Sequence, residues 1–416
     1  MKPRLSLALG ALIAAVLPLA GCAPQIAPTP TEVSAPVPTA TPEPTLQGKI
    51  TLWHAWTDPE VESLNEVING FEADYPQVSI EVLYVPASDL QGKFVTAAAA
   101  GGGPTLVIGA QDWGPPWFDA KLIADLTDLI PPGLLSSLNP TALEAVKYQG
   151  ALIGLPETIK GVLLFRNKRI INTAPASFDE LVKAAKAATK GGVVGADLES
   201  GLFYSAANLT SACGGQLADN QGKPAFNSEA GVCFLQLLTK FKTAGPVENN
   251  TDNDVNAFKA GKAGIIIDGS WNTSALAQAV GATNLAIDPW PSYGSGRLSG
   301  YLQTENLYLN AQASGDERQA ALAFMQYFLS PGAQRLLADP TKAGHVPSVA
   351  GVDIADPLVQ QEVAAFATSV IYPAQIWADY ADPLNNAIKK VVAANADPRA
   401  ALKEAEDAVN RKIAGG

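Results

Sequence analysis

The sequence is poor in the residues that build metal sites and nucleic-acid surfaces. Its 416 residues include two histidines, His54 and His345, and three cysteines. No HExxH motif and no paired Cys/His spacing of a zinc site is present. Lysine and arginine form no cluster, and the formal net charge is −12. We therefore expect no metal site, no cofactor and no nucleic-acid partner.

Catalytic motifs are missing as well. The sequence has no GxSxG, P-loop or GxGxxG motif, and "GSGRLSG" at 294–300 has the wrong spacing and no predicted helix after it. A glycosidase needs only two carboxylates about 5 to 10 Å apart, so a glycoside-acting enzyme stays open as an alternative. We expect a protein that is not an enzyme, and incubation with oligosaccharides without cleavage would separate the two classes.

Long apolar runs are confined to the N-terminus. Lys2 and Arg4 precede an apolar run from Leu5 to Ala20, which is short for a membrane span. The run ends in Leu19-Ala20-Gly21-Cys22, which resembles the lipobox of bacterial lipoproteins. The resemblance implies that residues 1–21 are a cleaved signal peptide and that the thiol of Cys22 is lipidated. An ordinary signal peptide followed by a chance cysteine is the alternative.

Residues 22–47 would form the lipidated cysteine and a Pro/Thr-rich tether. Seven prolines between Ala23 and Gln47 fix φ and remove amide donors, so neither a helix nor a sheet can form there. A polyproline-type chain of this length reaches at most roughly 75 Å. The expected protein is extracytoplasmic, and its lipid anchors it to the cell membrane. Without Lys2 and Arg4 its net charge is −14.

The body that follows is long enough for two domains, and its strand and helix patterns alternate. Period-2 alternation and short apolar runs predict strands, and apolar residues three or four apart predict helices. The resulting βαβαβ order implies a mainly parallel sheet with helices on both faces. The predicted elements are strands at 50–53, 78–84, 105–108 and within 263–271, and helices at 61–71, 90–100, 178–189, 255–259, 316–329, 331–338, 357–369 and 383–413.

Tryptophan is scarce, yet at least five of the seven tryptophans follow predicted strands. In open α/β sheets, ligands bind outside the carboxyl ends of the strands. Flat apolar rings beside carboxylates suit a sugar, whose C–H faces pack on aromatic rings while its hydroxyls need acceptors. Rings that only fill the interface between lobes are the alternative. The strand-end candidates are Trp53, His54, Trp56, Asp112, Trp113, Trp117, Asp268, Ser270 and Trp271.

Cys213 and Cys233 are the two cysteines that lipidation leaves. In an exported chain such a pair is a disulfide candidate. Closing a loop of about 20 residues would stabilise the fold by roughly 3 kcal/mol if the bond is unstrained. Two buried free thiols are the alternative.

Three long stretches, residues 211–247, 252–271 ("DNDVNAFKAGKAGIIIDGSW") and 314–348, resemble the extracellular solute-binding proteins of ABC sugar importers. The likeness is closest to the maltose/maltodextrin and multiple-sugar type. It implies a two-lobe periplasmic-binding-protein-like fold with a ligand cleft between the lobes. Crossing segments are expected near 152–168 and 289–301. The implied lobes are 48–158 with about 293–335, and 159–292 with about 336–416.

The resemblance also implies site residues. Trp271 is similar to the main stacking tryptophan of the family and Asp112 to its hydroxyl-binding aspartate, while Tyr204, Trp377 and Tyr380 lie near other aromatic positions. Three positions depart from the family pattern: Thr105 and Lys160 replace acidic residues, and Gly109 replaces an aromatic residue of maltose binders. The departures argue against maltose itself, although a carbohydrate remains the expected ligand.

The expected function is therefore capture of a carbohydrate outside the cell by cleft closure, and its delivery to ABC transporter permease subunits. We expect a monomer. The alternative is a sugar-sensing protein that docks on a membrane receptor, which would have the same fold and pocket. A pull-down of membrane partners would separate the two functions.

Overall fold

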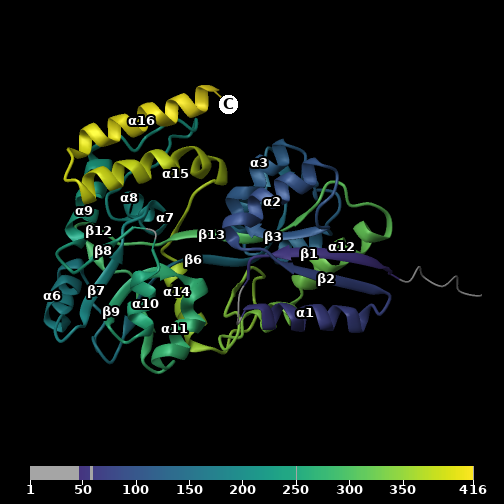
Figure 1. The fold of residues 1–416 in the computed structure, drawn as a ribbon, viewed down its shortest axis with the longest axis horizontal. Coiled ribbons are helices and arrows are strands. Elements are labelled where there is room, and N and C mark those ends of the chain that lie inside the picture. The colour runs from purple at the N-terminus through teal and green to yellow at the C-terminus, as the bar shows by residue number, and fades with distance from the viewer. Residues whose placement is uncertain (1–45, 57–59, 250, 416) are drawn as a thin grey trace, which may run out of the picture. The chain divides into compact units, whose positions relative to one another are not determined.

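A single sheet connects the two lobes of this protein (Figure 1). The computed structural model describes residues 46–56, 60–249 and 251–415. The strand order is β2-β1-β3-β13-β6-β9-β7-β8, with β10 and β14 beside β6, and β15 beside β13. We call β2, β1, β3 and β13 with their helices the first lobe, and β6, β9, β7 and β8 with theirs the second lobe. The predicted signal peptide, Cys22 and the tether up to residue 45 lie outside the described residues.

The first lobe has helices on both faces of its sheet. Leu64 and Phe71 of α1 pack with Phe324 of α12 on one face, while Phe94 of α2 and Trp117 of α3 pack on the other. Its elements are β1 (Gly48–His54), α1 (Glu60–Asp74), β2 (Val78–Tyr84), α2 (Ala87–Ala99), β3 (Leu106–Ala110), η1 (Gln111–Trp113), α3 (Gly114–Asp119), α4 (Pro132–Ser137), α5 (Pro140–Ala145), β4 (Lys147–Tyr148), β5 (Ala151–Leu152), β13 (Tyr301–Leu309), α12 (Gly315–Phe328) and α13 (Pro331–Leu337).

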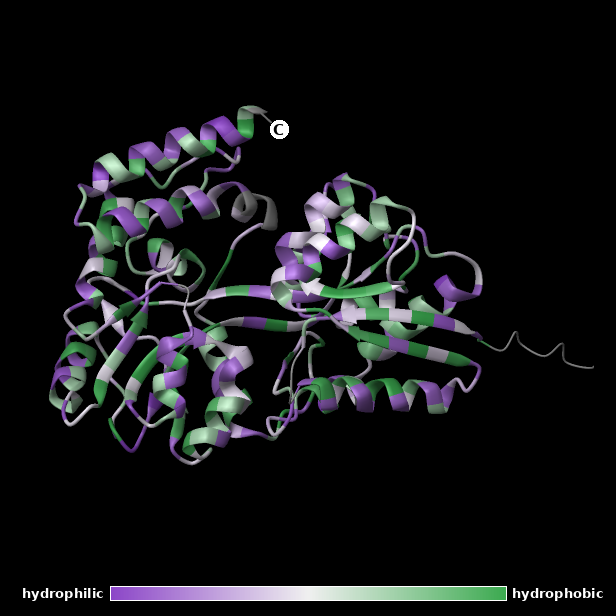
Figure 2. Ribbon diagram, in the orientation of Figure 1, coloured by the Kyte–Doolittle hydropathy of each residue, from purple (hydrophilic) through white to green (hydrophobic). Residues whose placement is uncertain are grey.

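The second lobe repeats this layered plan. Its elements are β6 (Leu155–Asn167), α6 (Phe178–Ala188), β7 (Val194–Glu199), α7 (Leu202–Ser205), α8 (Ala207–Ser211), α9 (Glu229–Phe241), β8 (Val247–Glu248), α10 (Asn253–Lys259), β9 (Ala263–Gly269), η2 (Ser270–Asn272), α11 (Thr273–Val280), β10 (Leu285–Ile287), β11 (Ser292–Tyr293), β12 (Gly296–Arg297), β14 (Val346–Pro347), α14 (Pro357–Phe366), β15 (Val370–Ile371), α15 (Ala374–Ile388), η3 (Lys389–Ala393) and α16 (Pro398–Gly415). Figure 2 shows hydrophobic residues along the strands and alternating hydrophilic and hydrophobic residues along the covering helices.

Two strands in the middle of the sheet join the lobes. Within the first lobe β1 runs parallel to β2 and β3, and within the second lobe β7 runs parallel to β8 and β9. β13 is antiparallel to both β3 and β6, and β6 is antiparallel to β9. All thirteen residues of β6 are buried, because the strand has neighbours along both edges and cover on both faces.

The C-terminal region differs from the sequence expectation. A continuous helix over 383–413 is wrong: α15 already contains Pro383 and is followed by the π-helical turn η3, and α16 begins only at Pro398. The break lies at Asn395, whose φ of 55° is left-handed. Asp397 then caps a new helix, because its Oδ1 accepts a hydrogen bond from the Ala400 amide at 2.9 Å. A proline at the start of a helix is favourable, since the first amides have no partner there anyway.

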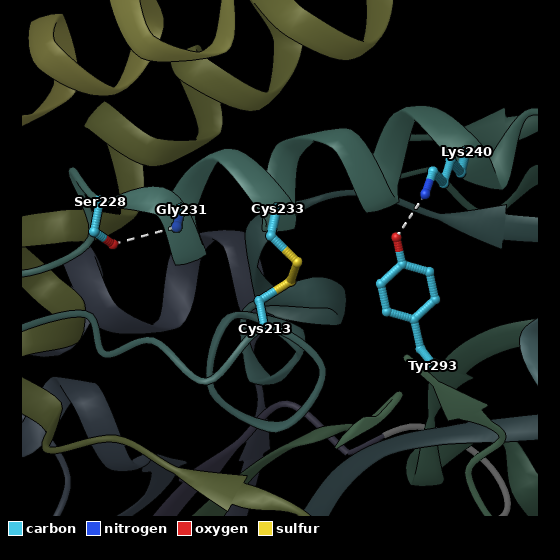
Figure 3. Close-up of a disulfide and its surroundings, with 6 residues drawn as sticks. All are labelled: Cys213, Ser228, Gly231, Cys233, Lys240 and Tyr293. Atoms are coloured by element: carbon cyan, nitrogen blue, oxygen red, sulfur yellow. Dashed lines mark hydrogen bonds between the residues drawn. A yellow bond between two sulfur atoms is a disulfide. The ribbon is translucent and has the colours of Figure 1, made fainter. Parts of the chain in front are cut away.

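A disulfide joins Cys213, which follows α8, to Cys233 in α9 (Figure 3). The two Cα atoms are 5.9 Å apart, within the usual range for such a bond. Ser228 caps the same helix, with its hydroxyl oxygen accepting from the Gly231 amide at 3.3 Å. Among the described residues, no helix is both long and apolar enough to cross a bilayer.

Candidate functional site

Two short helical turns carry a tryptophan each at the carboxyl end of a strand. β3 continues into η1 and β9 continues into η2, and the turns contain Trp113 and Trp271 respectively. Both side chains are half-buried. Because β3 belongs to the first lobe and β9 to the second, each lobe contributes one tryptophan at the strand edge where α/β proteins bind ligands.

Asp112 stands beside Trp113 in η1. It is half-buried, and burial raises the pKa of its carboxyl. The neighbouring Gln111 holds the turn in place: its amide nitrogen donates to the Tyr372 carbonyl at 3.4 Å, and its amide oxygen accepts from the Thr304 amide at 3.2 Å. The η1 turn is therefore bonded directly to β13 and to the segment before α15.

Aromatic rings from the second lobe and β13 gather between the two turns. Tyr301 stacks on Trp377, with ring centroids 4.5 Å apart and planes 6° from parallel, and its other neighbour Tyr372 lies at 5.8 Å. Phe203 contacts Tyr301 at 5.3 Å and Trp271 at 5.8 Å. We call Phe203, Tyr301, Tyr372 and Trp377 the aromatic group.

The aromatic group also approaches the η1 turn. Tyr301 is fully buried, and burial raises its pKa, with the nearby charge of Asp112 adding to the shift. α15, which carries Trp377, packs against η1 and α3. The η1 turn of the first lobe and Trp271 of the second lobe thus both adjoin the aromatic group.

Four carboxylates lie together where β7, α10 and β9 meet. This acidic cluster comprises Asp197, Glu199, Asp254 and Asp268, each at most 5% exposed. Burial, followed by the charge of Asp268, raises the pKa of Asp254 to about 8. Burial likewise raises the pKa of Asp268 to about 6, although the amides of Asn272 and Gly269 donate to its Oδ1 and oppose the shift.

Tyr204 faces the acidic cluster. It is half-buried, its ring centroid lies 5.4 Å from that of Phe203, and burial together with the charge of Asp268 raises the pKa of its hydroxyl. Tyr204 therefore connects the aromatic group to the cluster of acceptors.

Trp53, near the end of β1, and Trp56, just after it, do not form a pair. Trp53 is half-buried against the α2 and α3 side of the sheet. Trp56 is 2% exposed and packs with the α1 and α12 core on the opposite face, 6.3 Å from Phe328. Its indole nitrogen donates to Glu305 at 3.0 Å. Trp56 is a core residue with no free face for a ligand, which corrects the expectation that both rings line the site.

Two further candidates are also buried. His54 is 2% exposed, and its Nδ1 accepts a hydrogen bond from the Trp56 amide at 3.1 Å. Tyr380 is 1% exposed, and its hydroxyl donates to the Gly222 carbonyl at 2.9 Å. Their polar atoms are used within the protein, so the structure gives them a packing role in place of the expected ligand contact.

A second charged group lies where β6 and β13 cross between the lobes. Lys160 Nζ is 3.1 Å from Glu60 Oε1 and 2.5 Å from Glu305 Oε2. The ring of His345 lies between Glu60 and Glu157, at 3.1 and 3.2 Å. We call these five residues the crossing-strand cluster. It joins α1, β6, β13 and the segment before β14, so its role is to hold together the region between the lobes.

The charges of this cluster compensate one another. Burial opposes ionisation of Glu60, but Lys160 and His345 outweigh it and lower the pKa of Glu60 to about 2. Burial alone would lower the pKa of His345, but Glu157 and Glu60 raise it overall. Lys160, which the sequence comparison marked as a departure from an acidic family residue, is thus the central cation of the cluster.

A cavity of about 670 Å³ lies beside the η1 turn. Its lining includes Gln111, Pro115, Tyr148 and Tyr372. None of the tryptophans lines this cavity, so it adjoins the site without containing the stacking residues. No group of three His, Cys, Asp or Glu side chains arranged to bind a metal occurs in the part of the chain that the structure describes.

A family of bacterial extracellular solute-binding proteins matches residues 66–367. The chain belongs to this family. The maltotriose-binding protein of Pyrococcus abyssi is 26% identical over 258 residues, 59% of this chain and 54% of that protein. The galactooligosaccharide-binding protein of Bacillus subtilis is 23% identical over 386 residues, 86% of this chain and 88% of that protein. The chain thus matches about half the length of the first relative and most of the second.

Solved structures agree with the observed architecture. The maltose/maltodextrin-binding domain MalE from Bdellovibrio bacteriovorus, bound to maltotriose, has a TM-score of 0.78 at 23% identity, covering 88% of this chain and 100% of that one. The maltotriose-binding protein of Thermus thermophilus has a TM-score of 0.77 at 20% identity, with coverage of 88% and 100%. The predicted two-lobe α/β fold of this solute-binding protein is therefore confirmed.

Sequence reasoning missed part of the candidate site in this solute-binding protein. Phe203, Tyr301 and Tyr372 belong to the aromatic group but follow no strand that the sequence had predicted. Tyr301 opens β13 after a glycine-rich stretch, and its partner Trp377 is 76 positions later in the chain. No local sequence pattern predicts the contact between Tyr301 and Trp377. The predicted crossing segment over 289–301 does end at Tyr301, and it was the one signal that could have identified this residue.

Proposed function

We propose that this solute-binding protein captures a carbohydrate, in particular an oligosaccharide, between its lobes and delivers it to an ABC transporter permease. The observation that carries the proposal is that the aromatic group contacts Trp271 of the second lobe and, through Tyr372 and α15, the η1 turn of the first lobe, which contains Trp113. A sugar presents C–H faces to rings on both sides, and closure of the lobes brings such rings together.

The carboxyl groups at the same strand ends supply hydrogen-bond acceptors. Asp112 stands next to Trp113, and Asp268 lies three residues before Trp271. Sugar hydroxyls need acceptors when they leave water, because an unpaired buried polar group costs free energy. The proposed contact residues are Trp53, Asp112, Trp113, Tyr204, Asp268, Trp271 and Trp377. Asp268 is as buried as His54, Trp56 and Tyr380, but it is kept because it lies three residues before Trp271 and its charge acts on Tyr204. The other three are left out because they lie outside the two tryptophan turns and their polar atoms are bonded within the protein.

The names of the relatives support the ligand class. The relatives described above are named for binding maltotriose and galactooligosaccharides. The changed positions Gly109 and Lys160 argue against maltose, since the first lacks a ring and the second is committed to the crossing-strand cluster. We therefore favour an oligosaccharide other than maltose.

A thermal-shift screen of mono- and oligosaccharides tests the proposal. Binding adds RT ln(1 + [L]/Kd) to stability, so a ligand at 100 times its Kd adds about 2.7 kcal/mol. We expect at least one oligosaccharide to raise the melting temperature of wild type, and to raise that of Trp271→Ala much less. A panel of oligosaccharides without any shift, confirmed by calorimetry, would refute carbohydrate capture.

We further propose the lobe boundaries 48–158 with about 293–335, and 159–292 with about 336–416, with β6 and β13 as the segments about which the lobes close. Small-angle scattering with and without the sugar found in the screen tests closure. A smaller radius of gyration on binding is the expected result, and an unchanged radius would contradict it.

The anchor is a separate part of the proposal. Leu19-Ala20-Gly21-Cys22 supports lipidation of Cys22, which would hold a monomeric protein at the membrane near its permease. Cys22→Ser should release the protein into the soluble fraction without changing its sugar affinity. A variant that stays with the membrane fraction would argue against lipidation at this residue.

A further inference from the structure

Each of the two turn tryptophans lies directly against a glycine of its own strand. Gly109 is the next-to-last residue of β3, and a Cβ placed there would be 2.5 Å from Cε3 and 2.9 Å from Cζ3 of Trp113. Gly269 is the last residue of β9, and a Cβ there would approach Cζ2, Cη2 and Cε2 of Trp271 even more closely. In both lobes the ring therefore fills the space that a side chain on the strand would need.

The arrangement recurs in both lobes without sharing a sequence motif. Trp113 follows its glycine by four residues and Trp271 follows its glycine by two. The residues between belong to different 3-10 turns, η1 and η2. What the lobes share is the contact of an indole ring with bare strand backbone at the proposed ligand edge.

These glycines are not required by their backbone conformation. Gly269 has φ −78° and ψ 149°, which any residue adopts. Gly109 is absent from the positive-φ residues of the described chain. An added methyl group would meet a ring at the end of a movable side chain, in contrast to Gly245, whose Cβ would meet the carbonyl oxygen of Ala196. Alanine at 109 or 269 should thus shift the ring and leave the fold intact.

We infer that Gly109 and Gly269 are positioning residues that fix the orientation of Trp113 and Trp271 for ligand stacking. A ring held against the strand backbone is supported on that side and restricted in its torsion angles, so little side-chain freedom is lost when a sugar packs on it. The absence of a side chain at 109, where maltose binders carry an aromatic residue, is in this view what allows the ring of Trp113 to lie there. The inference rests on the proposed function only where affinity is measured, because those measurements require that the protein binds a sugar.

A double-mutant cycle on the full-length protein tests the inference. Gly109→Ala should raise Kd for the sugar identified in the screen about tenfold, by analogy with interface aromatic residues. In a Trp113→Ala background the same change should leave Kd unaltered, because the glycine acts only through the ring. Gly92→Ala, on the exposed side of α2 with nothing within 4 Å of its Cβ, is the matched control and should bind as wild type. Gly269→Ala and Trp271→Ala form the second cycle.

Near-UV circular dichroism and acrylamide quenching of the ligand-free variants provide a readout that needs no sugar. Gly109→Ala should change the tryptophan signal of the wild-type protein. The same substitution should leave the signal of the Trp113→Ala variant unchanged. An unchanged Kd and unchanged spectrum, or an equal effect with and without Trp113, would overturn the inference. If wild type bound no sugar, the proposed function would fail, while the spectra would still decide whether the glycine positions the ring.

Discussion

Two groups of buried carboxylates in this solute-binding protein are stabilised in opposite ways. In the crossing-strand cluster, Lys160 and His345 lie within 3.2 Å of glutamate oxygens. In the acidic cluster, the charges acting on Asp254 and Asp197 come from other carboxylates. Burial alone would raise the pKa of both groups, yet the pKa of Glu60 falls to about 2 while that of Asp254 rises to about 8.

The difference shows that neighbouring charges can outweigh burial, as they do at Glu60; at Glu157 of the same cluster burial prevails over His345 and raises the pKa to about 7. A carboxylate held between cations stays ionised and binds segments of the chain to one another. A carboxyl surrounded by others retains its proton, and a protonated carboxyl both donates and accepts hydrogen bonds. The first cluster is thus suited to holding the crossing region, and the second to meeting the hydroxyl groups of a ligand.

Removing the central cation should produce the largest effect. Lys160→Met leaves Glu305 without its counter-charge and Glu60 with His345 alone, and we expect the free energy of unfolding to fall by about 3–5 kcal/mol in urea titrations. Lys147→Met breaks an exposed pair with Glu144 and should cost less than about 1 kcal/mol. Similar losses for the two variants would mean that the crossing-strand cluster is not held together by its charges.

In the acidic cluster the main loss should be affinity. Asp268→Asn keeps the shape of the side chain but removes a charged acceptor, and hydrogen bonds to charged groups contribute about 2 kcal/mol. We expect a roughly thirtyfold higher Kd for the sugar by calorimetry, with a nearly unchanged melting temperature at pH 7. Asp89→Asn, on the exposed surface of α2, is the control. A destabilised protein with normal affinity would place Asp268 with the structural residues.

The pH dependence of the unfolding free energy should show that Asp254 is protonated in the folded protein. Its pKa is raised to about 8, so the folded protein keeps a proton that the unfolded chain releases near pH 4. The associated stability is present below pH 4 and is lost as the pH rises toward 8. Asp254→Asn abolishes this loss. The unfolding free energy of the variant minus that of wild type should therefore increase by about 2 kcal/mol between pH 5 and pH 8. Parallel pH profiles for variant and wild type would contradict the raised pKa.

Replacing His345 should give the smallest effect on stability, at pH values above 7. Glu157 and Glu60 raise its pKa above the ordinary value against the effect of burial. The stabilisation is fully present below about pH 6.5 and is lost as the pH rises toward the folded-state value. The unfolding free energy of wild type should therefore decline above pH 7 by on the order of 1 kcal/mol more than that of His345→Gln. A variant that keeps the full decline would show that His345 is not the titrating group.

Local patterns predicted the early strands and the tryptophan turns, because both depend on residues close in sequence. The strand over 78–84 has the predicted bounds, and the strand-end rule selected Asp112, Trp113, Asp268 and Trp271, which do lie at the ends of β3 and β9. The rule also selected Trp56, because it cannot tell on which face of a sheet a ring will pack. One residue of register separates a core position from the opposite face.

The crossing-strand cluster could not be predicted because its partners are far apart in the sequence. Lys160 is 100 positions from Glu60, and His345 is 188 positions from Glu157. Each residue looks like an ordinary surface charge in its own segment. Only the topology of β6 and β13, which depends on strand pairing across the whole chain, brings them together.

The place of β13 in the sheet affects the order in which this chain can fold. β3 ends at Ala110, but the strand that covers its free edge, β13, is complete only at Leu309. A chain emerging from an export channel would present the open edge of β3 while some 200 residues followed, and unpaired strand edges invite pairing with other chains. Pairing at such sequence separation is slow to form. The first lobe is thus the earliest part of the body to be made and among the last to be completed.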